Sequence, residues 1–479
     1  MNEKKRLVKN TLLIAIGNFG TKIITFLLLP LYTSLLSTSE YGTYDLIITI
    51  NVLVIPLVTF SMHEALFRFI IDAKKDSKEF AKIVSNALIA VLFGILILFL
   101  IILVIALIFS DYRSLLLFLF LITASNSLFL FSNNLLRGMG KIKQYAIISC
   151  VKNIIQLLLN ILVIVVFKLG INGLFISLFI SDIIAFIVVI TYSKLWKYMD
   201  IKLVNKKEIG PMLKYSMPLI PNALCAQIIH LSDRFVIIGF MGSSANGIYS
   251  ISYKFPSIME TIYHYFYTAW GESASRVFSK GKEKAIEYYQ SLHETINNFV
   301  FSSVIVLISF MPILFRFFIR GDYIDGFNYV PLLLLSMHFD CMAKFYSGIF
   351  TALKKTNVMA TTTVIAATIN ILINVLLIKY IGLYAAAGST LIAEFLLALL
   401  RRKKLKEYVQ LHLSNNTIIS MILVTIIVIS LYSYNNIIMI FSSIIVSLLY
   451  FSLANKKVLI VVLSKMKEKF VKRKKSAIN

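Results

Sequence analysis

The chain has 479 residues, 58% of them hydrophobic, and carries 48 Lys and Arg against 23 Asp and Glu, a formal net charge of +25. Long apolar runs use most of this length, so no water-soluble domain of ordinary size fits between them. The basic residues lie in short gaps between the runs. That distribution is typical of topology signals and anionic-lipid contacts rather than of a nucleic-acid-binding surface.

Fourteen apolar runs are candidate transmembrane helices, because about 20 apolar residues are needed to cross the hydrocarbon core. The sequence therefore predicts an all-α polytopic membrane protein with about 14 transmembrane helices. The first run is too long for the core of a cleavable signal peptide. In chain order the runs occupy residues 11–36, 45–69, 83–109, 114–136, 145–167, 171–194, 216–240, 247–272, 291–315, 328–352, 357–378, 382–400, 417–433 and 436–453.

The basic residues alternate between the two sides of the membrane when each run crosses it once. With the N-terminus in the cytoplasm, the cytoplasmic gaps hold 37 of the 48 Lys and Arg, and the outer gaps hold 5. The remaining 6 lie within the runs. This asymmetry is the one that cytoplasmic loops of membrane proteins show, so both chain ends are predicted to be cytoplasmic.

A short motif recurs after two of the runs with an offset of 205 residues. Gly42 and Tyr44 follow the first run, and Gly247 and Tyr249 follow the seventh. Both runs cross from the cytoplasmic to the outer side, so the repeat is parallel, about an axis along the membrane normal. It predicts two six-helix lobes and two extra helices. The divisions are an N-terminal lobe at 1–194, a cytoplasmic linker at 195–215, a C-terminal lobe at 216–400, and the extra helices with a basic tail at 401–479.

Charged residues inside the runs are concentrated in the first, second, seventh and eighth. Such residues are costly in a bilayer and mark candidate functional sites. These runs are equivalent pairs in the two predicted lobes, so we expect them to line a hydrated central cavity whose basic residues favour an anionic ligand. The candidate substrate-binding residues are Lys22, Glu64, Arg68, Asp233, Arg234, Lys254 and Glu260.

Some of these charges also have a structural interpretation. Glu64 and Arg68 are four residues apart on one helix face, so they can neutralise each other. Asp233 and Arg234 are adjacent and point in different directions. They cannot pair on one helix face, which leaves at least one of them for another helix or a ligand.

The remaining runs hold few charges, and one pair among them is again spaced for self-neutralisation. Asp340 and Lys344 are four residues apart in the tenth run. Lys152, Asp182 and Glu394 are single residues in other runs.

No catalytic or metal site is expected. The sequence has no Gly-x-x-x-x-Gly-Lys phosphate loop, so ATP hydrolysis is not predicted, and no Cys and His set has metal-ligand spacing. Cys150, Cys225 and Cys341 all lie within the runs and are interpreted as packing residues. The predicted outer loops are short, whereas a membrane glycan polymerase needs a larger outer platform for its acceptor.

Three stretches carry a family resemblance. They are Leu36-Ser-Thr-Ser-Glu-Tyr-Gly-Thr-Tyr-Asp45, Ser232-Asp-Arg-Phe-Val-Ile-Ile-Gly239 and Gly247-Ile-Tyr-Ser-Ile-Ser-Tyr-Lys254. Each is similar to a motif of the Wzx-type polysaccharide exporters, which belong to the multidrug/oligosaccharidyl-lipid/polysaccharide exporter superfamily. The resemblance extends over roughly residues 8–400, and its motifs are short and moderately specific.

The resemblance implies a V-shaped pair of lobes that alternates between inward- and outward-open states. It implies a transporter, not an enzyme, that flips an undecaprenyl-pyrophosphate-linked oligosaccharide across the bacterial inner membrane for O-antigen, capsule or another surface glycan. Cationic cavity residues of such proteins match Lys22, Arg234 and Lys254. The implied partners are the lipid-linked glycan, membrane lipids, a glycan polymerase and chain-length proteins. The two extra helices resemble the lipid II flippase branch, which leaves the substrate open.

Two other functions remain as alternatives. A drug or small-molecule antiporter of the same superfamily would favour an acidic or aromatic cavity for cationic drugs, which the basic excess argues against. A membrane glycan polymerase is disfavoured by the short outer loops.

Overall fold

The structure is a computed structural model that describes residues 26–73, 78–278, 281–434, 436–460 and 464. Within these ranges the secondary structure is helical, with no strand. Eleven described helical stretches are long and apolar enough to cross a membrane. Each predicted run from the second onward coincides with described helix, and the first reaches the described chain only at its end. The predicted all-α fold class is confirmed.

The chain divides into two compact units. Unit 1 comprises residues 1–250 and 320–323, and unit 2 comprises residues 251–319 and 324–479. The predicted lobe boundary at 195–215 stays a prediction.

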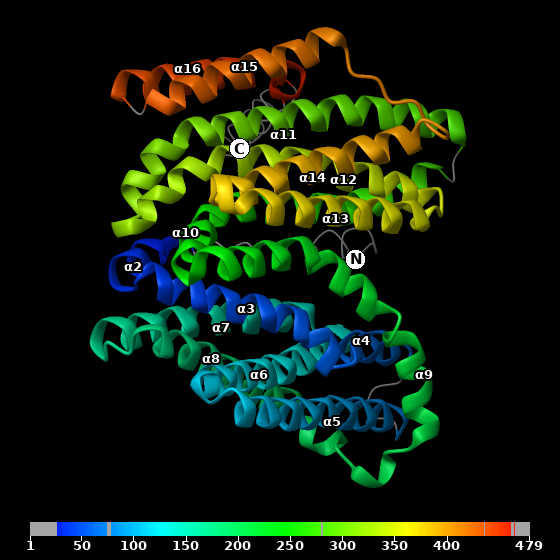
Figure 1. Cartoon of the computed structure of the whole chain (residues 1–479). Helices are drawn as coiled ribbons and strands as arrows, with labels where there is room; N and C mark the ends of the chain where they lie inside the picture. The colour runs from blue at the N-terminus through cyan, green and yellow to red at the C-terminus, as the bar shows by residue number, and fades with distance from the viewer. Residues whose placement is uncertain (1–25, 74–77, 279–280, 435, 461–463, 465–479) are drawn as a thin grey trace, which may run out of the picture. The chain divides into compact units, whose positions relative to one another are not determined.

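Unit 1 contains α2 to α9 and the first part of α10. Helix α6 packs against α4, α5, α7 and α8, so it is the central helix of this unit (Figure 1). The bounds are α2 Leu29–Leu35, α3 Thr38–Val58, α4 Met62–Asp72, α5 Lys78–Ile108, α6 Arg113–Gly138, α7 Ile142–Ile161, α8 Gly170–Ser193 and α9 Lys206–Ser216.

Unit 2 contains the rest of α10 and the helices up to α16. Helix α14 packs against α12 and α13, while α11 contacts α12 as well as α15 and α16 (Figure 1). The bounds are α10 Leu219–Phe278, α11 Lys282–Phe318, α12 Val330–Ala352, α13 Thr356–Ile381, α14 Leu383–Leu405, α15 Asn415–Tyr434 and α16 Ile437–Ala454.

The second predicted span is broken into α3 and α4. Helix α3 starts with a capping box, in which the Ser37 hydroxyl accepts from the Glu40 backbone N–H and the Glu40 carboxylate accepts from the Ser37 backbone N–H at 2.9 Å. It ends where Phe60 and Ser61 both adopt a φ of 49°. A left-handed backbone at two successive residues cannot continue a right-handed helix, so α4 starts anew after them.

The seventh and eighth predicted spans are joined through Gly242. This residue has a φ of 85° and a ψ of 175°, a backbone conformation that is open to glycine but strained for other residues. Residues 243–246, which the sequence suggested as a loop, are helical. The break between the two spans is therefore a single residue wide.

The two copies of the repeated motif pack against each other within unit 1. A Cβ atom added at Gly42 would lie 1.8 Å from the Ser243 carbonyl oxygen, and one added at Gly247 would lie 2.0 Å from the Thr38 carbonyl oxygen. The Asn246 side-chain amide donates to the Gly42 carbonyl at 2.7 Å. Glycines thus let two backbones approach more closely than any side chain allows.

Unit 2 has an aromatic core around Trp270. Its indole ring stacks on Phe345 with ring centroids 4.6 Å apart, and its Nε1–H donates to the Phe345 carbonyl oxygen at 2.8 Å. Gly348 lies under the same ring, where a Cβ would be 2.4 Å from indole atoms. A buried indole is stable here because its polar N–H has an acceptor.

Candidate functional site

The predicted site residues fall into separate groups. Glu64, Arg68, Asp233 and Arg234 belong to unit 1, and Lys254 and Glu260 belong to unit 2. Lys22 lies outside the residues that the structure describes.

Arg234 forms a buried ion pair with Asp45. Its Nε lies 2.9 Å from Asp45 Oδ2, and each residue is 6% exposed. The pair links α10 to α3. Taking one charge of such a pair away leaves the other buried without its partner, which costs about 3–5 kcal/mol.

Asp233 takes a different partner from its neighbour. The Tyr249 hydroxyl donates to Asp233 Oδ2 at 2.9 Å, and both residues are buried. Adjacent residues on a helix diverge, so Asp233 and Arg234 have different partners, as their spacing predicts. Tyr249 belongs to the repeated motif, and the first motif ends at Asp45. The sequence did not mark Asp45 as an interior charge because it stands at the edge of a predicted span.

Glu64 and Arg68 lie on α4. Glu64 is in the first turn, where the positive end of the helix dipole stabilises a carboxylate, and its Oε1 is 3.9 Å from His63 Nε2. Arg68 is exposed.

Glu260 belongs to a charged cluster in unit 2. Lys344 Nζ lies 2.6 Å from Asp340 Oδ2 and 3.4 Å from Glu260 Oε1. The predicted pairing of Asp340 with Lys344 is therefore present, and Glu260 joins it from α10. Lys254, two turns earlier on α10, is half-buried.

Two residues of α14 complete this region, and sequence reasoning missed the role of both. Glu394 is 8% exposed and lies within electrostatic range of Asp340 and Lys344. Arg401 was counted with the cytoplasmic loop charges but is 6% exposed, which corrects that assignment. Its guanidinium donates to Thr362 Oγ1, Thr363 Oγ1 and the carbonyls of Ala343 and Met359. The helix is longer than its apolar run, so a residue placed after the run lies inside the fold.

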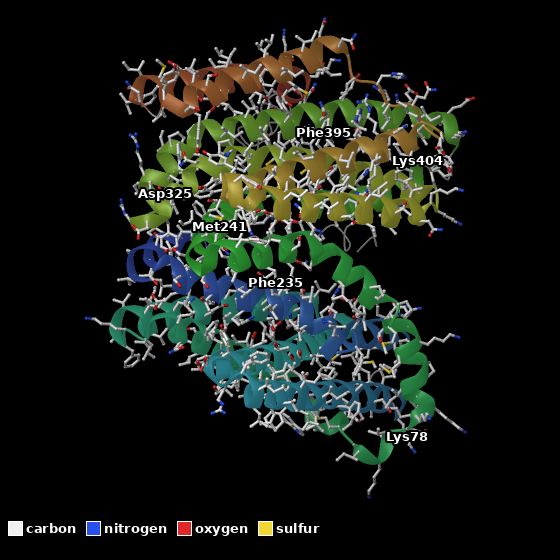
Figure 2. All side chains as sticks on the ribbon, viewed as in Figure 1. Lys78, Phe235, Met241, Asp325, Phe395 and Lys404 are labelled. Carbon is white, nitrogen blue, oxygen red and sulfur yellow. The ribbon has the colours of Figure 1, made fainter. Side chains whose placement is uncertain are left out.

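An apolar cavity of about 720 Å³ lies in unit 2, lined by residues of α11, α12, α14 and α15. Phe395, in the middle of α14, contributes to its wall, and Lys404 marks the basic end of that helix (Figure 2). Arg402 also lines the cavity and donates to the Leu411 carbonyl at 3.3 Å, while its buried Nε–H has no acceptor within the described chain. The other polar lining residues are Asn297, His338, Tyr346 and Thr425.

A many-helix membrane fold with buried ion pairs and an apolar cavity of about 720 Å³ defines a polytopic membrane protein of the transporter type. The family model described as "Polysaccharide biosynthesis protein" matches residues 7–270, and the chain belongs to this family. The family expected from the loop motifs is thereby confirmed.

Three solved structures show the same fold. A lipid II flippase, MurJ, in an inward closed conformation superposes with a TM-score of 0.69 at 18% identity, over 94% of this chain and 100% of that one. A multidrug-resistance MATE transporter has a TM-score of 0.66 in its inward-facing conformation, at 14% identity over 83% of this chain and 98% of that one. A MATE transporter in its outward-facing conformation has a TM-score of 0.57, at 15% identity over 85% of this chain and 96% of that one. No curated protein matches the chain significantly.

Proposed function

We propose that the protein flips undecaprenyl-pyrophosphate-linked oligosaccharide units across the bacterial inner membrane for surface polysaccharide synthesis, with both chain ends in the cytoplasm. Membership of the polysaccharide biosynthesis protein family supports a glycan-related task, and the fold shared with a lipid II flippase supports a lipid-linked substrate. The protein acts as a transporter and not as an enzyme. Its further partners are membrane lipids, a glycan polymerase and chain-length proteins.

The observation that carries this proposal is the apolar cavity with Arg402 at its margin. A lipid-linked glycan has a long apolar chain joined to an anionic pyrophosphate. The cavity walls match the chain, and the unused N–H of the guanidinium matches a phosphate oxygen. Flipping is slow without protein because a hydrated, charged head group has to cross hydrocarbon.

In this proposal the predicted site residues bind the head group of the lipid-linked glycan. Lys22, Arg68 and Lys254 would contact the pyrophosphate, and Arg234 would do so in exchange for Asp45. The acidic Glu64, Asp233 and Glu260 would keep the basic residues in place. Basic residues around the head group lower the cost of moving its charge across the membrane, while the lipid chain stays in an apolar environment.

The fold likeness to multidrug transporters favours a second candidate, export of small cationic molecules. The two functions differ in what the cavity should hold. A drug site for cations is expected to present carboxylates or aromatic faces. This cavity has aromatic faces, among them Phe339 and Phe395, but its charged side chain is the cation Arg402, which favours an anion.

The test is transbilayer movement in vesicles that contain the purified protein. A fluorescent undecaprenyl-pyrophosphate-linked sugar is added, and a membrane-impermeant quencher reports how much lies in the outer leaflet. We expect flipping well above that of protein-free vesicles. Equal rates in the two preparations would refute the function, and drug uptake in its place would establish the second candidate.

A matched pair of variants tests the cavity. Thr425 lines the cavity, and Leu423, on the same helix, does not line it and is 55% exposed. We expect Thr425→Trp to slow flipping about tenfold or more, because the indole fills space needed by the chain, and Leu423→Trp to flip at the wild-type rate. Equal rates for Thr425→Trp and the wild type would remove the cavity from the mechanism.

A further inference from the structure

Glu394 on α14 is a buried carboxyl group with an unused oxygen atom. The residue is 8% exposed, and its Oε2 is buried and has no hydrogen-bond partner within the described chain. Burying an ionised carboxylate without a partner costs several kcal/mol, and such groups neutralise instead. This oxygen is therefore suited to carry a proton.

The charged groups around Glu394 come from three helices. Its own helix contributes Arg401, seven residues later on the same face, and α10 contributes Glu260. Helix α12 contributes Asp340, Lys344 and the Cys341 thiol. In the sequence of α13, the other helix packed against α14, no ionisable side chain occurs before Lys379.

Neither Arg401 nor Lys344 forms a hydrogen bond or ion pair with Glu394 within the described chain. Arg401 donates to two threonine hydroxyls and two backbone carbonyls, which fixes its guanidinium elsewhere. Lys344 is shared between Asp340 and Glu260, at 2.6 Å and 3.4 Å. An ionised Glu394 would add a further carboxylate beside these two cations, and a bound proton removes its charge.

The ligand that fits is a proton. A metal ion needs several converging ligands, and the described part of the chain holds no group of three or more His, Cys, Asp or Glu side chains placed to hold one. A proton needs a single oxygen atom, and Glu394 Oε2 is one.

We propose that Glu394 is the proton-binding site that couples transport to the proton gradient, an inference that rests on the proposed flippase function. With the proton bound, Lys344 stays with Asp340 and Glu260, as in this structure. When the proton leaves to water, the new charge on α14 competes for the Lys344 ammonium. Deprotonation thereby weakens the ion pair of Lys344 that links α12 to α10 and draws the ammonium toward α14. A packed helix bundle responds to such a change by switching between discrete arrangements.

The first experiment needs no substrate and does not depend on the flippase function. Infrared difference spectroscopy of the purified protein, with H₂O exchanged for D₂O and pH stepped, detects the carbonyl stretch of a protonated carboxyl. We expect such a band in the wild type, and its loss in Glu394→Gln. Asp182→Asn is the matched control, because Asp182 is a buried carboxylate already paired with Lys152 at 2.5 Å, and should leave the band intact. A wild type without the band, or a band that survives in Glu394→Gln, overturns the assignment.

The second experiment tests the coupling in the flipping assay with imposed ion gradients. We expect a pH gradient to accelerate flipping by the wild type. Glu394→Gln should lose this acceleration while still responding to substrate concentration, and Glu394→Asp should restore part of it. Acceleration by a sodium gradient alone, or an unchanged proton response in Glu394→Gln, would refute the proton site. Wild-type protein that flips no substrate would refute the proposed function and leave the infrared result standing.

Discussion

The buried pair of Asp45 and Arg234 allows structural and substrate-binding roles to be separated. With Nε and Oδ2 2.9 Å apart and both residues 6% exposed, each charge has been removed from water and depends on its partner. We expect Asp45→Asn and Arg234→Gln to lower the free energy of unfolding by about 3–5 kcal/mol each, since either change breaks a buried ion pair and keeps one of its charges in the protein interior. The double variant removes both charges and should lose much less than the sum of the two.

The assay is a double-mutant cycle on thermal or denaturant unfolding in detergent micelles. The matched control is the pair of Lys82 and Glu208, which lie 2.8 Å apart with side chains 36% and 40% exposed. An exposed pair of this kind contributes only about 0–1 kcal/mol, so its cycle should show little coupling. Single variants at Asp45 and Arg234 as stable as the wild type, or a double variant whose loss equals the sum, would refute the reasoning.

The same variants test whether Arg234 also contacts substrate. Arg234→Gln is expected to abolish glycan export while the protein remains in the membrane. If Arg234 served only to neutralise Asp45, the double variant would regain flipping together with stability. We expect it to regain stability and to remain inactive in the vesicle assay, because the cation that would bind the pyrophosphate is still missing. A fully active double variant would leave Arg234 a structural role only.

Two glycine substitutions test the close contacts in each unit. Gly42→Ala puts a Cβ 1.8 Å from a backbone carbonyl oxygen, so the free energy of unfolding should fall by about 3 kcal/mol or more. Its control is Gly210→Ala on α9, where a Cβ meets nothing within 4 Å and the helix should gain up to about 1 kcal/mol. In Gly348→Ala the added Cβ lies 2.4 Å from indole atoms of Trp270, and the free energy of unfolding should fall by about 1–3 kcal/mol, because an indole side chain can shift further than a backbone carbonyl. Its control is Gly388→Ala, where a Cβ meets nothing within 4 Å. Thermal melting in detergent measures all four, and controls as unstable as their test variants would contradict both predictions.

The helix order was predictable because hydropathy and length decide whether a segment spans a membrane. The pairing of Asp340 with Lys344 was predictable for a similar reason, since a spacing of four residues fixes neighbours on a helix. Breaks of one or two residues were not predictable. The break at Phe60 and Ser61 does not interrupt the apolar pattern, and the kink at Gly242 is narrower than the gap of residues 241–246 that the pattern predicts. Both depend on backbone angles that composition does not report.

Ion pairs and hydrogen bonds between distant parts of the chain could not be predicted from the sequence either. Asp45 and Arg234 are 189 residues apart, and Arg401 reaches Thr362 on another helix. Counting basic residues by gap predicts a topology, because most Lys and Arg in short loops follow the orientation rule. The same count could not tell Arg401 from its neighbour Lys404, because only the packed structure shows that one is buried and the other exposed.

The motifs that carry the family resemblance have an evident packing role. Gly42 and Gly247 let two backbones come into close contact. Asp45, the last residue of the stretch that begins at Leu36, forms an ion pair with Arg234 in the stretch Ser232–Gly239. Small residues and paired charges of this kind hold helices together in a membrane, whatever the transported molecule is. The groups with unused binding capacity, Glu394 and Arg402, lie outside these motifs on α14. Substitutions of Glu394 and Arg402 on α14 should therefore change ion and substrate selectivity, whereas substitutions of the motif glycines should change the stability of the fold.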